Sequence, residues 1–215
     1  GYQQWSRRTE ARQTIAAVKQ EPTLLPDGSS LLLSAKAAAD VDFTGVNRNV
    51  ALRPGAEAYI KVHHDKARPF IVHAGALTVT AVGTAFDVRR DAGRVTVTVE
   101  EGAVQLVAPG PNGPTRWRAA AGVRVAYSED SRTAVVSNVD PNVALRWRYG
   151  ELAYDDTPLE AVIADVNRYS TAHVVVRDPE VERLRFTGTV FVVSICDWLK
   201  ALEAEYPVTT RDLGD

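Results

Sequence analysis

The sequence predicts two domains, an all-β domain followed by a small α+β domain. From Leu24 onward, short apolar runs separated by Gly, Pro and Asp turns recur with no helical pattern between them. Along residues 95–99, Val and Thr alternate, as in a strand with one buried face. After residue 142, apolar residues also recur at helical spacing between strand-like runs. The pattern therefore changes once along the chain.

The all-β domain should contain many short strands. Periodicity leaves open whether they form a sandwich, a barrel or a short solenoid. Residues 6–20 are charged and weakly helical, so we expect a solvated lead-in or a short helix there. The segment 109–116, rich in Pro and Gly, is expected to be a loop. The strands are expected at 31–35, 49–52, 56–63, 70–74, 77–81, 84–89, 95–100, 103–108, 122–127 and 133–136.

The apolar phase reverses next to Gly83. Leu77 and Val79 share one strand face, whereas Phe86 and Val88 lie in the opposite phase. A one-residue change of phase moves every side chain to the other face. We therefore expect a β-bulge or a tight bend at Gly83.

The C-terminal pattern predicts the order β-α-β, β-α-β. Strands are expected at 150–154, 173–177, 185–193 and 208–212. One helix is expected to begin at a capping box formed by Thr157 and Glu160. A second is expected to begin at a capping box formed by Ser194 and Asp197 and to end before Pro207. The predicted organisation is a lead-in at 1–20, the all-β domain at 21–140 and the α+β domain at 144–215.

Composition argues against several functional classes. The 25 basic and 27 acidic residues nearly cancel, which disfavours nucleic-acid binding. No run approaches the roughly 20 apolar residues of a membrane span. The chain starts at Gly1 without Met, so we expect further sequence upstream. Hydrolase, phosphate-loop and dinucleotide motifs are not found in the sequence.

The candidate metal ligands and nucleophiles are better explained structurally. Neighbouring side chains such as His63 and His64 diverge in a strand and cannot grip one ion. His73 and His173 are expected to be structural. Cys196, the single cysteine, falls in a first helical turn and is expected to be a buried packing residue. We expect no metal, no cofactor and no enzymatic activity.

An ordered series of short motifs resembles the FecR family of sigma regulators. The segments 147–152 and 155–159 resemble the junction to that family's C-terminal secretin/TonB short N-terminal (STN) domain. The resemblance extends over residues 24–213. Its motifs are 25–29 (LPDGS), 42–45 (DFTG), 54–59 (PGAEAY), 68–70 (RPF), 82–88 (VGTAFDV) and 99–102 (VEEG).

The resemblance implies a periplasmic region of a protein tethered in the inner membrane by one helix. It implies three kinds of partner. The signalling domain of a TonB-dependent outer-membrane receptor would supply the signal, often one related to iron or siderophores. An extracytoplasmic-function sigma factor would bind a cytoplasmic segment upstream of Gly1, and periplasmic or intramembrane proteases would process the regulator.

Two sets of residues are candidate sites. Some members of the family cleave themselves at a Gly-Thr bond, which here would be Gly83–Thr84, by attack of the Thr hydroxyl on the preceding carbonyl. An intact chain with a bulge is the favoured interpretation. The strand at 185–193 is a candidate partner-binding edge, although burial between sheet and helices explains it equally well. Its candidate contact residues are Thr187, Thr189, Val190, Phe191, Val192 and Val193.

Two other functional classes remain open from the sequence. A structural module of a secretin or outer-membrane system would also carry an STN domain, but that domain normally comes first. A carbohydrate-binding β protein would need an array of exposed aromatic residues. The four tryptophans, Trp5, Trp117, Trp147 and Trp198, are scattered instead.

Overall fold

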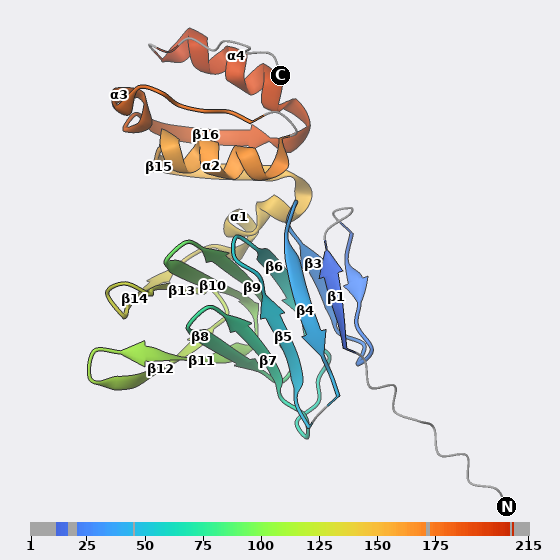
Figure 1. Cartoon of the computed structure of the whole chain (residues 1–215). Helices are drawn as coiled ribbons and strands as arrows, with labels where there is room; N and C mark the ends of the chain where they lie inside the picture. The colour runs from blue at the N-terminus through green and yellow to red at the C-terminus, as the bar shows by residue number, and fades with distance from the viewer. Residues whose placement is uncertain (1–11, 17–20, 45, 171–172, 207, 209–215) are drawn as a thin grey trace, which may run out of the picture. The chain divides into compact units, whose positions relative to one another are not determined.

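The computed structural model describes residues 12–16, 21–44, 46–170, 173–206 and 208 of the 215-residue chain. The chain forms two compact units, Gly1–Pro141 and Asn142–Asp215 (Figure 1). Among the described residues, the helices are all too short or too polar to cross a bilayer. The predicted division into domains at 21–140 and 144–215 stays a prediction.

Two seven-stranded sheets enclose the core of the first unit. Sheet A contains β1 (Arg12–Ala16), β4 (Ala38–Asp42), β5 (Arg48–Leu52), β7 (Phe70–Ala74), β8 (Leu77–Ala81), β11 (Ala103–Gly110) and β12 (Gly113–Ala120). Sheet B contains β2 (Thr23–Leu24), β3 (Ser30–Leu33), β6 (Glu57–Lys61), β9 (Ala85–Asp91), β10 (Arg94–Glu101), β13 (Val123–Ser128) and β14 (Thr133–Asn138).

The strands of each sheet stand side by side in chain order, from β1 to β12 and from β2 to β14. The chain crosses to the other sheet after every one or two strands. This path combines a sandwich with a solenoid-like progression, two of the three arrangements that periodicity left open. Only one adjacent pair among the described strands, β5 with β7, is parallel.

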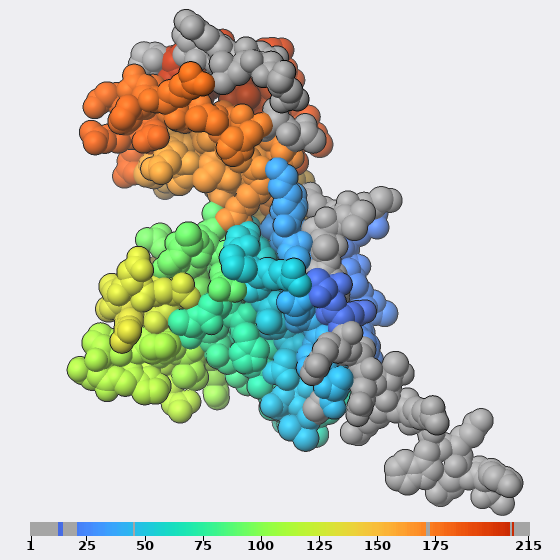
Figure 2. Space-filling view, in the orientation of Figure 1, coloured from blue at the N-terminus to red at the C-terminus, as the bar shows by residue number. Residues whose placement is uncertain are grey.

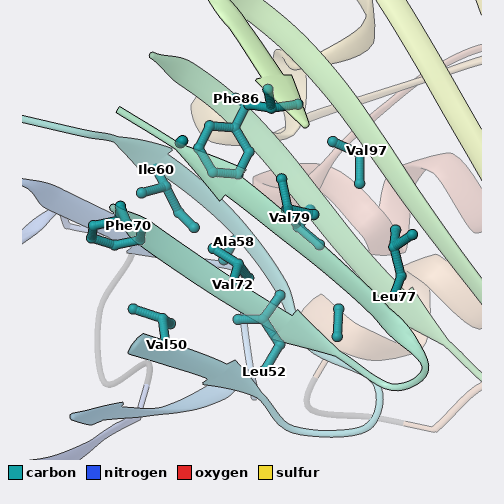
Figure 3. Close-up of a cluster of buried hydrophobic side chains, with 14 of the residues drawn as sticks. Val50, Leu52, Ala58, Ile60, Phe70, Val72, Leu77, Val79, Phe86 and Val97 are labelled. Carbon is teal, nitrogen blue, oxygen red and sulfur yellow. The ribbon is translucent and has the colours of Figure 1, made fainter. Parts of the chain in front are cut away.

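Side chains from both sheets meet in one apolar core (Figure 3). Sheet A contributes Val50, Phe70 and Val79, and sheet B contributes Ile60 and Phe86; all five are fully buried. In β5 and β8 the buried positions alternate with half-buried residues, whereas in β9 the neighbours of Phe86 are buried as well. The alternation is what made the strands predictable.

The bend at Val82–Thr84 confirms the predicted break at Gly83. Here the chain leaves β8 in sheet A and enters β9 in sheet B. The phase of buried residues reverses because the core lies on opposite sides of the two sheets. A comparable corner at Gly102 (φ 77°) joins β10 to β11, in a left-handed conformation that glycine adopts without a Cβ penalty.

All ten strands predicted in this unit are present, with ends shifted by up to two residues. The expectation of helical character is wrong for residues 12–16, which form β1 and pair with β4. The predicted loop at 109–116 is also wrong, because β11 and β12 run through it and only residues 111–112 turn. Pro109 lies opposite Pro114, beyond the part of β11 that pairs with β8, so its missing N–H costs no ladder bond to β8.

The second unit contains one two-stranded sheet and several helices. After α1 (Pro141–Ala144) and the 3-10 helix η1 (Arg146–Tyr149) come β15 (Glu151–Pro158), α2 (Leu159–Tyr169) and α3 (Pro179–Glu182). Next are β16 (Arg185–Phe191), the 3-10 helix η2 (Val192–Ser194) and α4 (Ile195–Glu205). β15 and β16 are antiparallel. The two longer helices are close to their predicted positions.

Residues 173–177 are not a strand, contrary to the prediction. The Asn167 side chain bonds both polar groups of the Val174 backbone, with Nδ2 donating to the carbonyl (2.8 Å) and Oδ1 accepting from the N–H (2.7 Å). An amide side chain thus takes the place of a neighbouring strand. Most of the strand expected at 208–212 lies outside the described residues.

Neither predicted capping box forms. Thr157 belongs to β15 and its hydroxyl donates to the Asp155 carbonyl (3.0 Å). The first N–H of α2, on Leu159, donates instead to the Leu184 carbonyl (2.8 Å). Ser194 makes no side-chain capping hydrogen bond to α4. A backbone carbonyl from a distant segment can satisfy a helix start without a side-chain cap.

A buried ion pair joins the two sheets of the first unit. The Arg48 guanidinium, at the start of β5, donates from Nη1 to Asp27 Oδ2 (2.6 Å), and both side chains are at most 2% exposed. The same guanidinium donates to the carbonyls of His63 (2.9 Å) and Arg68 (2.8 Å). It also lies over the Phe70 ring, 5.4 Å from the centroid. The turn before β3 and the loop from β6 to β7 therefore close around one charge.

Replacing Asp27 with Asn should destabilise the first unit by about 3–5 kcal/mol, because Arg48 then stays buried without a counter-charge. The matched control is Asp40→Asn, which breaks the Asp40–Arg53 pair, whose side chains are about half exposed. That control should cost less than about 1 kcal/mol. Urea unfolding measures both free energies, and equal losses would contradict a special role for the buried pair.

Candidate protein-docking surface

Among the described residues of the second unit, α2 and α4 pack against the sheet formed by β15 and β16. Phe186 and Val190 of β16 are buried on the covered face, together with Leu152 of β15 and Val162 of α2. The Phe186 ring lies at the centre of this small core. Its centroid is 6.0 Å from that of Tyr154, 5.7 Å from Trp198 of α4 and 6.4 Å from Tyr206.

The other face of β16 carries the candidate contact residues. Thr187 and Phe191 are exposed, and Thr189 between them is half-buried. Because residues two apart share a strand face, these three side chains form one row. Val193, in η2 just after the strand, is 94% exposed. We call Thr187, Thr189, Phe191 and Val193 the β16 surface.

The six predicted contact residues differ in their exposure to solvent. Four of them form the β16 surface. Val190 is fully buried and belongs to the core, which corrects its assignment as a contact residue. Val192, in η2, is half-buried, and its backbone N–H donates to the Gly150 carbonyl (2.9 Å). The continuous apolar run therefore divides between core and surface.

A bulge in β15 shapes one end of the β16 surface. The register of β15 against β16 shifts between Tyr154 and Thr157. Asp156 has a positive φ of 42°, and its N–H donates to Thr187 Oγ1 (2.8 Å). Asp156 Oδ2 also pairs with Arg185 Nη2 (3.2 Å). The hydrogen bond from Asp156 thus fixes the Thr187 side chain. The bulge was not predicted from the sequence.

No further strand pairs with β15 or β16 in the described part of the chain. Each strand therefore has an outer edge that makes no ladder with another described strand. Such an edge, beside the exposed side chains of Phe191 and Val193, suits the addition of an extended segment of another protein. No group of three or more His, Cys, Asp or Glu side chains among the described residues could hold a metal ion.

Cys196 is exposed, contrary to the expectation of a buried packing residue. In α4, Ile195 and Leu202 face the core, seven residues apart and therefore on one side of the helix. Cys196 lies next to Ile195 in the sequence, about 100° around the helix from it. Helical phase, rather than the residue type, decides its exposure.

The candidate cleavage site lies at the corner between β8 and β9. The Thr84 side chain is 7% exposed, and its hydroxyl has no hydrogen-bond partner among the described residues. The corner itself is held on both sides, because Val62 N–H donates to the Thr84 carbonyl (2.9 Å) and Asp65 N–H to that of Val82 (3.0 Å).

Gly83 has little space around its Cα. A Cβ there would lie 2.5 Å from His64 Nδ1, so the imidazole packs directly against this residue. Gly83 is not among the residues with a positive φ, and backbone strain at the bond is therefore not indicated. The site combines a buried hydroxyl, which has no partner among the described residues, with a glycine whose φ is not positive.

Two comparisons with known proteins found similarities, one in the structure of the chain and one in its sequence. Two crystal structures of a candidate anti-sigma factor from Parabacteroides distasonis ATCC 8503 resemble the whole chain. Their TM-scores are 0.80 and 0.82 at 24% and 23% identity, with 94% of this chain and 95% of theirs covered. At that identity the likeness is one of fold. The comparison with curated proteins produced no match. Residues 13–105, most of the first unit, match the FecR protein family.

Proposed function

We propose that this chain is the periplasmic signalling region of a sigma regulator of the FecR kind. The carrying observation is the FecR match over residues 13–105, in a chain that shares its fold with a candidate anti-sigma factor over 94% of its length. Two motifs of the family resemblance, 25–29 and 68–70, both contact the buried Arg48. The region that matches the family therefore includes the motifs that enclose the buried Arg48.

In this proposal the full-length protein is tethered in the inner membrane. A segment upstream of Gly1 binds an extracytoplasmic-function sigma factor in the cytoplasm. The signalling domain of a TonB-dependent receptor, responding to an iron source such as a siderophore, delivers the signal in the periplasm. Proteases in the periplasm or the membrane then release the regulator from its tether.

The second unit is proposed to be an STN-like receiver, with the β16 surface as the contact. Phe191 is 50% exposed and Val193 is 94% exposed, so they offer apolar area without unfolding the core. The neighbouring strand edge offers backbone N–H and C=O groups to an extended segment. Apolar area would supply affinity, and the ladder would fix the register of the bound strand.

The docking proposal is tested by calorimetric titration of the whole chain against the signalling domain of a TonB-dependent receptor from the same genome. We expect a Kd in the micromolar range or tighter, about −8 kcal/mol. The double variant Phe191→Ser with Val193→Ser should bind at least about tenfold more weakly, because apolar contact is lost.

The matched control is Val175→Ser, which changes a 58% exposed valine outside β16 in the same unit. It should leave the Kd unchanged. Equal weakening by the control would move the contact away from the β16 surface. Failure of every candidate receptor domain to bind would favour the alternative of a structural assembly module.

For Gly83–Thr84 we propose an intact chain, since the φ angle of Gly83 indicates no strain. Mass spectrometry of the purified protein should show one species. The matched variant Thr84→Val keeps the shape but removes the nucleophile and an unpaired buried hydroxyl. Its free energy of unfolding should be unchanged or higher by roughly 1 kcal/mol. Two fragments in the wild type and one species in the variant would instead establish self-cleavage.

A further inference from the structure

Strand β14 is an outermost strand of sheet B, and its side chains are uncharged. No described strand pairs with its outer edge. Its sequence, TAVVSN, contains no charged residue and no proline. Val135 is 70% exposed and Val136 is 55% exposed, although they point to opposite faces of the strand. The strand, yellow in Figure 2, lies at the surface of the first unit.

Two other edges of the same sandwich are protected against strand pairing. β2 has only two residues and follows Pro22 directly. β12, at the end of sheet A, contains Pro114 and two arginines, Arg116 and Arg118. Short strands, prolines and charges are the usual means of blocking an edge. β14 has six residues and none of these features, so nothing in the strand itself blocks pairing along its edge.

The hydrogen bonding of β14 shows which of its backbone groups face outward. Val139 N–H donates to the Gly122 carbonyl (2.8 Å), in register with the β13–β14 ladder, where Val125 lies opposite Val136. In an antiparallel ladder, hydrogen-bonded and non-bonded residue pairs alternate. Odd-numbered residues of β14 therefore bond to β13. The N–H and C=O groups of Ala134, Val136 and Asn138 point toward the open edge.

We propose that two copies of this chain pair through β14, antiparallel, with Val136 on the two-fold axis. Because the N–H and C=O groups of the even-numbered residues face outward, even-numbered residues must form the hydrogen-bonded pairs, and odd-numbered residues then lie opposite one another in the non-bonded pairs. Centring on Val136 meets this condition, pairs residues 134–138 of the two copies and places Ala134 opposite Asn138 of the second copy. The same surface serves both copies, so the pair is closed and does not extend into a fibre.

Charges at the ends of β14 favour a second copy as the occupant. Arg132 precedes the strand and Asp140 follows it. In the register centred on Val136, Arg132 of each copy lies at the level of the second copy's Asp140. The pairing thus brings two sets of opposite charges together and no like charges, which stabilises cross-strand pairs. This inference does not depend on the proposed signalling function.

Sedimentation equilibrium of the whole chain, from about 10 µM to about 1 mM, tests the pairing over the range expected of a small transient interface. We expect a reversible monomer–dimer equilibrium. Val136→Lys places two ammonium groups at the axis and should raise the dimer Kd at least about tenfold. Val46→Lys, at an 80% exposed valine outside β14, is the control and should leave it unchanged.

A charge exchange tests the register itself. Arg132→Asp and Asp140→Arg should each dimerise several-fold more weakly, because each homodimer then contains two like-charge pairs. An equimolar mixture of the two variants should dimerise about as well as the wild type, since both of its pairs are opposite in charge.

Three results would overturn the proposal. The first is a wild type that stays monomeric at every concentration, which would leave an extended segment of a different protein as the partner of this edge. The second is equal dimerisation of the Val136→Lys and Val46→Lys variants. The third is a mixture of the two charge variants that associates no better than either alone. Circular dichroism of each variant checks that the fold is kept.

Discussion

The buried charge of Arg48 is the constraint on which the first unit depends. An enclosed guanidinium is tolerated only when a counter-charge and good acceptors surround it. Asp27 and the carbonyls of the loop between β6 and β7 supply them, so that loop and the turn before β3 must both be in place. In the same loop, a hydrogen bond from Arg68 keeps the pKa of Asp65 below its ordinary value, which helps to fix the loop's conformation. The N–H of Asp65 in turn holds the corner before β9.

Much of the fold could be predicted because half-buried strands carry an alternating pattern. Phe70–Ala74 and Leu77–Ala81 were predicted with the observed ends, since each alternates between buried and accessible residues and is bounded by turns. β4 was missed because its small and acidic residues, AADVD, indicate a strand only once β1 and β5 lie on either side. Arg48 was missed for a related reason. A lone arginine in the sequence gives no sign that separate segments will close around it.

The candidate docking surface could be predicted as a segment but not residue by residue. The apolar run at 190–193 was recognised, yet which of its side chains face outward depends on which face α2 and α4 cover. Val190 and Phe191 are equally apolar and have opposite environments, fully buried and half exposed. Cys196 shows the same limit in a helix. In each case composition identifies the element, while tertiary packing decides the exposure of its members.

The matching order of strands along the chain and across both sheets has a consequence for how the first unit is made. Each new hairpin is laid beside one that precedes it in the chain, so a nascent polypeptide could assemble the sandwich from its N-terminal end while still being extended. Contacts stay close in sequence, which favours rapid folding for an all-β domain. Stability should then spread from layer to layer, as in repeat proteins. In the last layer to form, β12 and β14 have no later strand beside them among the described residues.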